Sequence, residues 1–149
     1  MPANTDPIFT RLGSKGSVLI TAANTSSQGG GTIGTDIFLA FTCDATNGSF
    51  IQRVRFIPTA TAPTTTTATV GRVFFSTVAS GATTSANTWL WQDIGLPAIS
   101  ADNTVAGSTF FDIPLGFALP SGVQTILVTN HAAPAASTAW RAVVIAGDY

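Results

Sequence analysis

Charged residues are scarce in this chain of 149 residues, at 9% against the roughly 25% of an average globular protein. Six basic and seven acidic residues give a net charge of −1, and every acidic residue is an aspartate. Because there is no basic excess to neutralise a phosphate backbone, we expect no binding to nucleic acid. The 45% of hydrophobic residues exclude a wholly disordered chain, which would be poor in them.

Cysteine and long hydrophobic runs are also missing. The single cysteine, Cys43, excludes an intrachain disulfide framework and fits synthesis in the cytosol. No hydrophobic run approaches the roughly 18 residues of a membrane span, and residues 1–7 lack the basic and apolar stretches of a signal peptide. We expect one domain that has no contact with a membrane, since a chain of this length builds one core.

Strong helix formers are rare, while Thr, Val, Ile and Phe are common. Short apolar runs alternate with Gly, Pro, Asn and Ser, a spacing typical of an all-β domain. The pattern predicts eight strands, at Ser17–Ala23, Asp36–Cys43, Phe50–Ile57, Arg72–Val78, Thr88–Ile94, Thr109–Leu115, Val123–Asn130 and Ala139–Ala146. Alternation in the third of these places Phe50, Val54 and Phe56 on one face, and Arg53 and Arg55 on the other.

The segments between the predicted strands carry turn residues. Asn47-Gly48 is predicted to form a hairpin turn, and Pro120-Ser121-Gly122 to separate two strands in the same way. Residues 24–35 and 59–71 are predicted to be long loops. Residues 1–16 have little periodicity and are predicted to form an irregular N-terminal arm, followed by a β-sandwich domain at residues 17–149.

Eight short strands in one domain predict a two-sheet sandwich, and the eight-stranded version is the jelly roll. An immunoglobulin-like sandwich is the alternative, although the sequence lacks the Cys…Trp…Cys pattern of that fold.

No residues combine into a convincing catalytic or metal site. His131 is the only histidine, and no Gly-x-Ser-x-Gly nucleophile motif accompanies it. Cys43 ends an apolar strand and has no basic residue near it in the sequence. Thiols in such positions are usually buried and unreactive. Zinc favours clustered Cys and His, and the seven Asp are scattered. We expect no enzyme activity, no bound metal and no cofactor.

Tryptophan and the low surface charge are the clues to function. Trp89 and Trp91 lie two residues apart, so a regular strand would place them on one face with Leu90 opposite. Such a pair can fill a core or subunit contact, or stack on a sugar ring. A surface with few charges indicates that copies of the chain or another protein cover it. In the arm, Ile8, Phe9 and Leu12 are candidate anchors on a neighbouring molecule.

Several segments resemble small virion proteins of tailed bacteriophages and prophages. They are Ala3–Thr10, Ala22–Thr25, Gly31–Thr35, Ile113–Pro120 and Val144–Tyr149. The resemblance implies a structural role, and the group includes head decoration (cement) proteins of this size. Such proteins are often β-sandwiches that sit as trimers on the outside of the capsid and clamp neighbouring subunits.

We therefore expect a homotrimer that binds the major capsid protein on the capsid exterior. Its candidate interface residues are Ile8, Phe9, Leu12, Trp89 and Trp91. Two alternatives stay open. One is a host-binding or carbohydrate-binding module of a tail or fibre with Trp89 and Trp91 as its platform, and the other is a small enzyme centred on His131.

Overall fold

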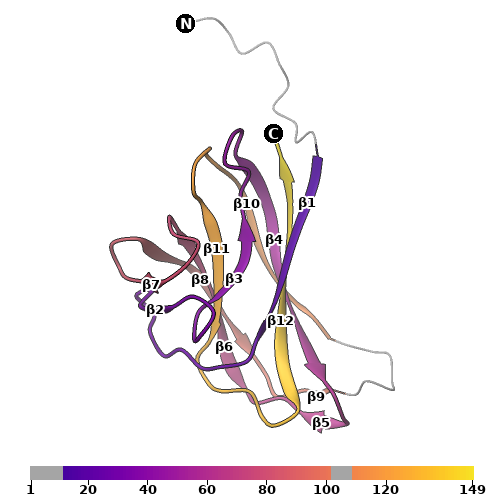
Figure 1. Ribbon diagram of the computed structural model, residues 1–149. Coiled ribbons are helices and arrows are strands. Elements are labelled where there is room, and N and C mark those ends of the chain that lie inside the picture. The colour runs from indigo at the N-terminus through magenta and orange to yellow at the C-terminus, as the bar shows by residue number, and fades with distance from the viewer. Residues whose placement is uncertain (1–11, 102–108) are drawn as a thin grey trace, which may run out of the picture.

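The protein is all-β in the computed structural model, which describes residues 12–101 and 109–149 (Figure 1). No helix occurs in these ranges, and therefore none that is long and apolar enough to cross a membrane. All eight predicted strands are present, with their ends shifted by a few residues. The sequence prediction of an all-β sandwich is confirmed.

The eight long strands form two four-stranded antiparallel sheets. In spatial order, the first sheet contains β1 (Leu12–Ile20), β12 (Thr138–Asp148), β4 (Ser49–Ala60) and β10 (Phe111–Leu119). The second sheet contains β3 (Phe38–Thr42), β11 (Thr125–Asn130), β6 (Thr69–Ser76) and β8 (Thr88–Leu96).

The strands pair from the two ends of the chain inward. Among the eight, the first pairs with the last, β1 with β12, and the second with the seventh, β3 with β11. The third pairs with the sixth, β4 with β10, and the fourth with the fifth, β6 with β8. A long antiparallel ribbon folded across two sheets produces this pairing.

Two short ribbons lie in segments that the sequence predicted as loops or left unassigned. β2 (Gly31–Thr32) pairs with β7 (Ala82–Thr83), and β5 (Thr64–Thr65) pairs with β9 (Ser100–Ala101). Figure 1 shows β2 and β7 on the side of the second sheet that faces away from β1 and β12. Ile33 and Ile37, which follow β2, pack there against Phe74 and Leu127. The chain therefore covers part of the outer face of its second sheet.

The core lies between the sheets, because each strand turns alternate apolar side chains toward the other sheet. It includes Ile20, Val54, Phe56, Ile113, Trp140 and Val144 from the first sheet and Phe41, Val73, Leu96, Ile126 and Val128 from the second.

One detail of the predicted alternation is wrong. The register of β4 shifts against both of its neighbours at Gln52, so this residue forms a β-bulge. The bulge turns Ile51 into the core in place of Phe50, whereas Val54 and Phe56 face inward as predicted.

The predicted hairpin turns are also wrong, because the strands that they join lie in different sheets. Asn47-Gly48 connects β3 to β4, and residues 120–122 connect β10 to β11. Gly48 has a φ of +82°, which few other residues adopt. The Asp44 carboxylate accepts the backbone N–H of Asn47 at 2.7 Å and holds the turn. Turn residues alone do not distinguish a hairpin from a crossing between sheets.

The N-terminal boundary differs from the prediction as well. The strand β1 begins at Leu12, so residues 12–16 belong to the sandwich, and the rest of the predicted arm lies outside the described residues. Gly13 and Gly16 made this stretch look irregular in sequence. Gly16 is needed because a Cβ there would overlap the backbone carbonyl oxygen of Ala40, where β1 lies closely against β3.

Candidate functional site

Three large apolar side chains lie in succession on β8, an edge strand of the second sheet. Trp89, Leu90 and Trp91 have exposed fractions of 48%, 38% and 49%. Exposed edge strands with large apolar side chains are rare in proteins that work alone, because they promote association.

The Trp91 ring is held by two phenylalanines. Its centroid lies 5.1 Å from that of Phe75 on β6 and 5.1 Å from that of Phe117 on β10. Phe75 and Phe117 meet edge to face at 4.5 Å, a favourable geometry for aromatic pairs. The three rings thus join the two sheets at one side of the sandwich. We call Trp89, Leu90, Trp91, Phe75 and Phe117 the aromatic edge.

Trp89 and Trp91 do not follow a regular alternation. Val73 pairs with Gln92 and Phe74 with Leu90, so Trp91 is the extra residue of a β-bulge. Trp89 pairs with Phe75 in the ladder. The two-residue spacing predicted that both tryptophans lie on one face. That prediction assumed regular alternation along the strand, which the bulge at Trp91 interrupts.

The other candidate interface residues lie apart from this edge. Leu12 is 69% exposed at the start of β1, on the opposite edge of the first sheet from β10. Ile8 and Phe9 lie outside the described residues. Sequence reasoning missed Phe75 and Phe117, because residues far apart in sequence meet only through the packing of the two sheets. The adjacent position of Leu90 was the one signal of a larger patch.

His131 lies exposed just after β11 and contacts an arginine. The Arg72 Nη2 donates to the His131 Nδ1 at 3.2 Å, and its Nη1 donates to the backbone carbonyl of Asn24 at 3.1 Å. Because a guanidinium can only donate, the His131 Nδ1 is the acceptor of this contact. Within residues 12–101 and 109–149 no nucleophile or carboxylate joins the pair, so this geometry does not build a triad.

Cys43 is buried immediately after β3. Burial raises the pKa of its thiol to about 11, against a lowering contribution from the Ser49 hydroxyl and a further raising one from Asp148. The thiol is therefore protonated at neutral pH, a form that is a poor nucleophile. The described part of the chain holds no group of three or more His, Cys or acidic side chains that could bind a metal ion.

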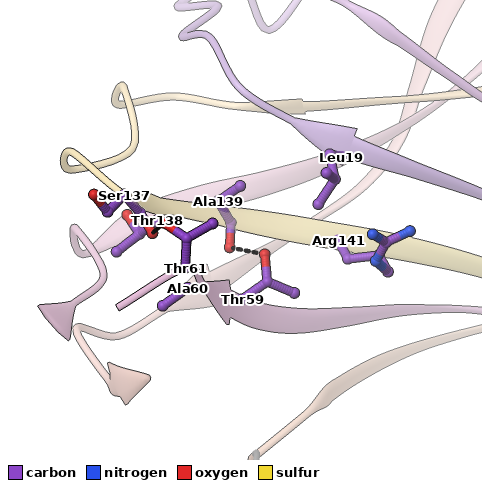
Figure 2. Close-up of a pocket in the computed structure, with 8 residues that line it drawn as sticks. All are labelled: Leu19, Thr59, Ala60, Thr61, Ser137, Thr138, Ala139 and Arg141. Carbon is purple, nitrogen blue, oxygen red and sulfur yellow. Dashed lines mark hydrogen bonds between the residues drawn. The ribbon is translucent and has the colours of Figure 1, made fainter. Parts of the chain in front are cut away.

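An open groove of about 380 Å³ lies on the outer face of the first sheet (Figure 2). Ala139 and Arg141 on β12 form part of its lining, with Leu19 of β1 on one side and Thr59 of β4 on the other. The Thr59 hydroxyl donates to the Ala139 carbonyl at 3.0 Å. Ser137, also in the lining, has a φ of +63°, a strained conformation for a residue with a side chain.

The same outer face carries a charge cluster. The Arg55 Nε and Nη2 donate to the two carboxylate oxygens of Asp112 at 2.7 and 2.8 Å. Arg53 lies 3.7 Å from the same carboxylate, and the Arg55 guanidinium lies 3.7 Å over the ring of Phe110. Hydrogen bonding from Arg55 holds the pKa of Asp112 below its usual value. The lowered pKa keeps the Asp112 carboxylate ionised at neutral pH.

A comparison with protein-family models and with curated proteins found no match to this chain.

Proposed function

We propose that the protein is a non-enzymatic virion subunit of a tailed bacteriophage, and in first place a capsid decoration (cement) protein. In this role it assembles as a homotrimer and binds the major capsid protein on the outside of the shell. The strand pairing of the sandwich is the one expected for a jelly roll, an architecture that viral capsid domains use.

The aromatic edge carries the proposal. Its side chains from Trp89 to Trp91 are each more than a third exposed on a strand that has one free edge. Aromatic residues of this kind are enriched at subunit contacts. The chain also has few surface charges to oppose association. A trimer presents three copies of one binding surface, so its affinity for the capsid is high through multivalency even if each single contact is weak.

The first test is the mass of the purified protein by light scattering after size exclusion. We expect about three times the 15.2 kDa of the chain. Trp89→Ser should yield monomers without unfolding the protein, because the Trp89 ring is half exposed. Val123→Ser removes a side chain of similar exposure from the loop between β10 and β11, and should remain trimeric. A monomeric wild type would contradict the trimer.

The second test is co-sedimentation with assembled capsids of the phage that encodes the chain. The proposal expects stoichiometric binding to capsids, little binding to free capsid subunits, and presence of the protein in purified virions. Its absence from virions would exclude a decoration role.

One observation favours a carbohydrate-binding module of a tail or fibre as the second candidate. Phe75 and Phe117 support the Trp91 ring, while 49% of that residue stays exposed and available to stack on a sugar. Binding on a glycan array that disappears in a folded Trp91→Ala variant would establish this function. Trimerisation and capsid binding without any glycan signal would exclude it.

A further inference from the structure

On the outer face of the first sheet, basic and apolar residues lie side by side on neighbouring strands. One row of neighbours across the strands is Leu19, Arg141 and Ile57. The next rows are Ser17, Val143, Arg55 and Asp112, and then Lys15, Ile145, Arg53 and Pro114. We call this surface the basic face, meaning Lys15, Arg53, Arg55 and Arg141 with Leu19, Ile57, Val143 and Ile145 between them.

The charge on the basic face is opposite in sign to that of the chain. Four of the six basic residues of the sequence lie on it, although the chain carries a net charge of −1. Asp112 is the one carboxylate in these rows, and Arg55 and Arg53 share it. Arg141 contacts the Ser17 hydroxyl at 3.2 Å. Neither Arg141 nor Lys15 forms an ion pair with a described carboxylate.

The two sheets differ in how the chain treats their outer faces. Ile33 and Ile37 pack over the second sheet. Among the described residues only the Phe110 ring covers part of the basic face, at Arg55, and the groove beside Arg141 and Leu19 opens to solvent. Apolar side chains next to unpaired cations are the composition of a contact surface.

We infer that the basic face binds a protein surface that presents acidic side chains among apolar ones. An acidic side chain of the partner enters the groove and pairs with Arg141. Leu19 and the methyl groups of the threonines that line the groove contact the apolar side chains next to it on the partner. This inference rests on the proposed function in one respect, because it names the basic face as the side that meets the capsid.

Charge decides between this occupant and two others. A second copy related by a two-fold axis would place the same four cations against one another, and this repulsion disfavours it. A nucleic acid would use a surface of cations and polar groups, whereas half of the residues that define the basic face are apolar.

The test is an NMR titration of the labelled wild-type protein with a short synthetic peptide of alternating Asp and Leu. We expect backbone shifts confined to β1, β12 and residues 53–60 of β4. Arg141→Glu should raise the Kd roughly three- to tenfold, the range expected for a partly screened ion pair. Arg141→Lys keeps the charge and should stay near wild type. Val123→Ser, in the loop between β10 and β11, should bind as wild type does.

Several outcomes would overturn the inference. These are no shifts at millimolar peptide, shifts on the second sheet, or an unchanged Kd in Arg141→Glu. Stronger binding of a DNA duplex at the same residues would replace the acidic protein with a nucleic acid.

Capsid co-sedimentation separates this inference from the proposed function. If wild type and Arg141→Glu bind capsids equally, the basic face is not the capsid contact and the decoration role stands. If no variant binds capsids but the peptide binds the basic face, the decoration role fails and the acidic-partner surface stands.

Discussion

The close approach of β1 and β3 predicts that two glycines on one strand tolerate a methyl group very differently. At Gly16 a Cβ would overlap the backbone carbonyl of Ala40, which cannot swing aside as a flexible side chain can. At Gly13, three residues earlier on β1, nothing lies within 4 Å of the same position. Neither glycine has a positive φ, so backbone strain is equal for the two substitutions and only the space differs.

The expected effects have opposite signs. Gly16→Ala must push two strands apart, and overpacking of this kind lowers the free energy of unfolding by about 2 kcal/mol. Gly13→Ala restricts the unfolded chain without a clash, and raises that free energy by about 0.5 kcal/mol. For a chain of this size, Gly16→Ala should lower the Tm by roughly 4–8 °C.

Urea unfolding followed by tryptophan fluorescence measures both variants against wild type. The dependence of the unfolding free energy on urea should stay unchanged, since the surface exposed on unfolding is the same. Equal stability of Gly16→Ala and Gly13→Ala would refute the reasoning. It would mean that residues 12–16 do not pack against β3 and belong to the N-terminal arm that their sequence suggests.

Four further variants, at three positions, test the core and the charges. Because burial raises the pKa of Cys43 from 9.0 to about 11, its contribution to stability is intact below pH 9 and is lost as the pH rises toward 11. Wild type should lose roughly 2–3 kcal/mol more than Cys43→Ala over that range, and parallel losses in alkaline urea titrations would contradict this. Asp112 has a lowered pKa, so its contribution is present above its ordinary pKa near 4 and disappears as the pH falls through the lowered value. Asp112→Asn should therefore be less stable than wild type at neutral pH by up to about 1 kcal/mol and equal to it in strong acid, and a constant difference at every pH would count against the ion pair. The Trp140 indole N–H is buried without a hydrogen-bond partner among the described residues. Trp140→Phe should cost within about 1 kcal/mol, because removing an unpaired donor offsets lost packing, whereas Trp140→Ala should cost about 3–5 kcal/mol; similar costs for both would show that the N–H is satisfied.

Local pattern was sufficient to predict the strands. Each of the eight predicted runs became a long strand, since β-branched and aromatic residues separated by turn residues favour no other regular structure in this chain. Arg53 and Arg55 lie on the outer face as alternation predicted. Cys43 is buried, as its position at the end of an apolar strand predicted.

The errors arose where a backbone irregularity or a distant neighbour intervened. Single extra residues at Gln52 and Trp91 reset the two-residue alternation, and composition does not reveal which residue will bulge. The irregular look of residues 12–16 was misleading because Gly16 serves the contact with Ala40, a residue of another sheet.

The sequence by itself determined the class of fold, since scarce helix formers and short apolar runs leave antiparallel sheets as the way to bury them. Only the tertiary structure decided which strands are neighbours. That choice places Phe75 and Phe117 around Trp91, and gathers Lys15, Arg53, Arg55 and Arg141 on one face. Pairing between the two ends of a chain depends on the packing of the whole sandwich, and no local stretch of residues encodes it.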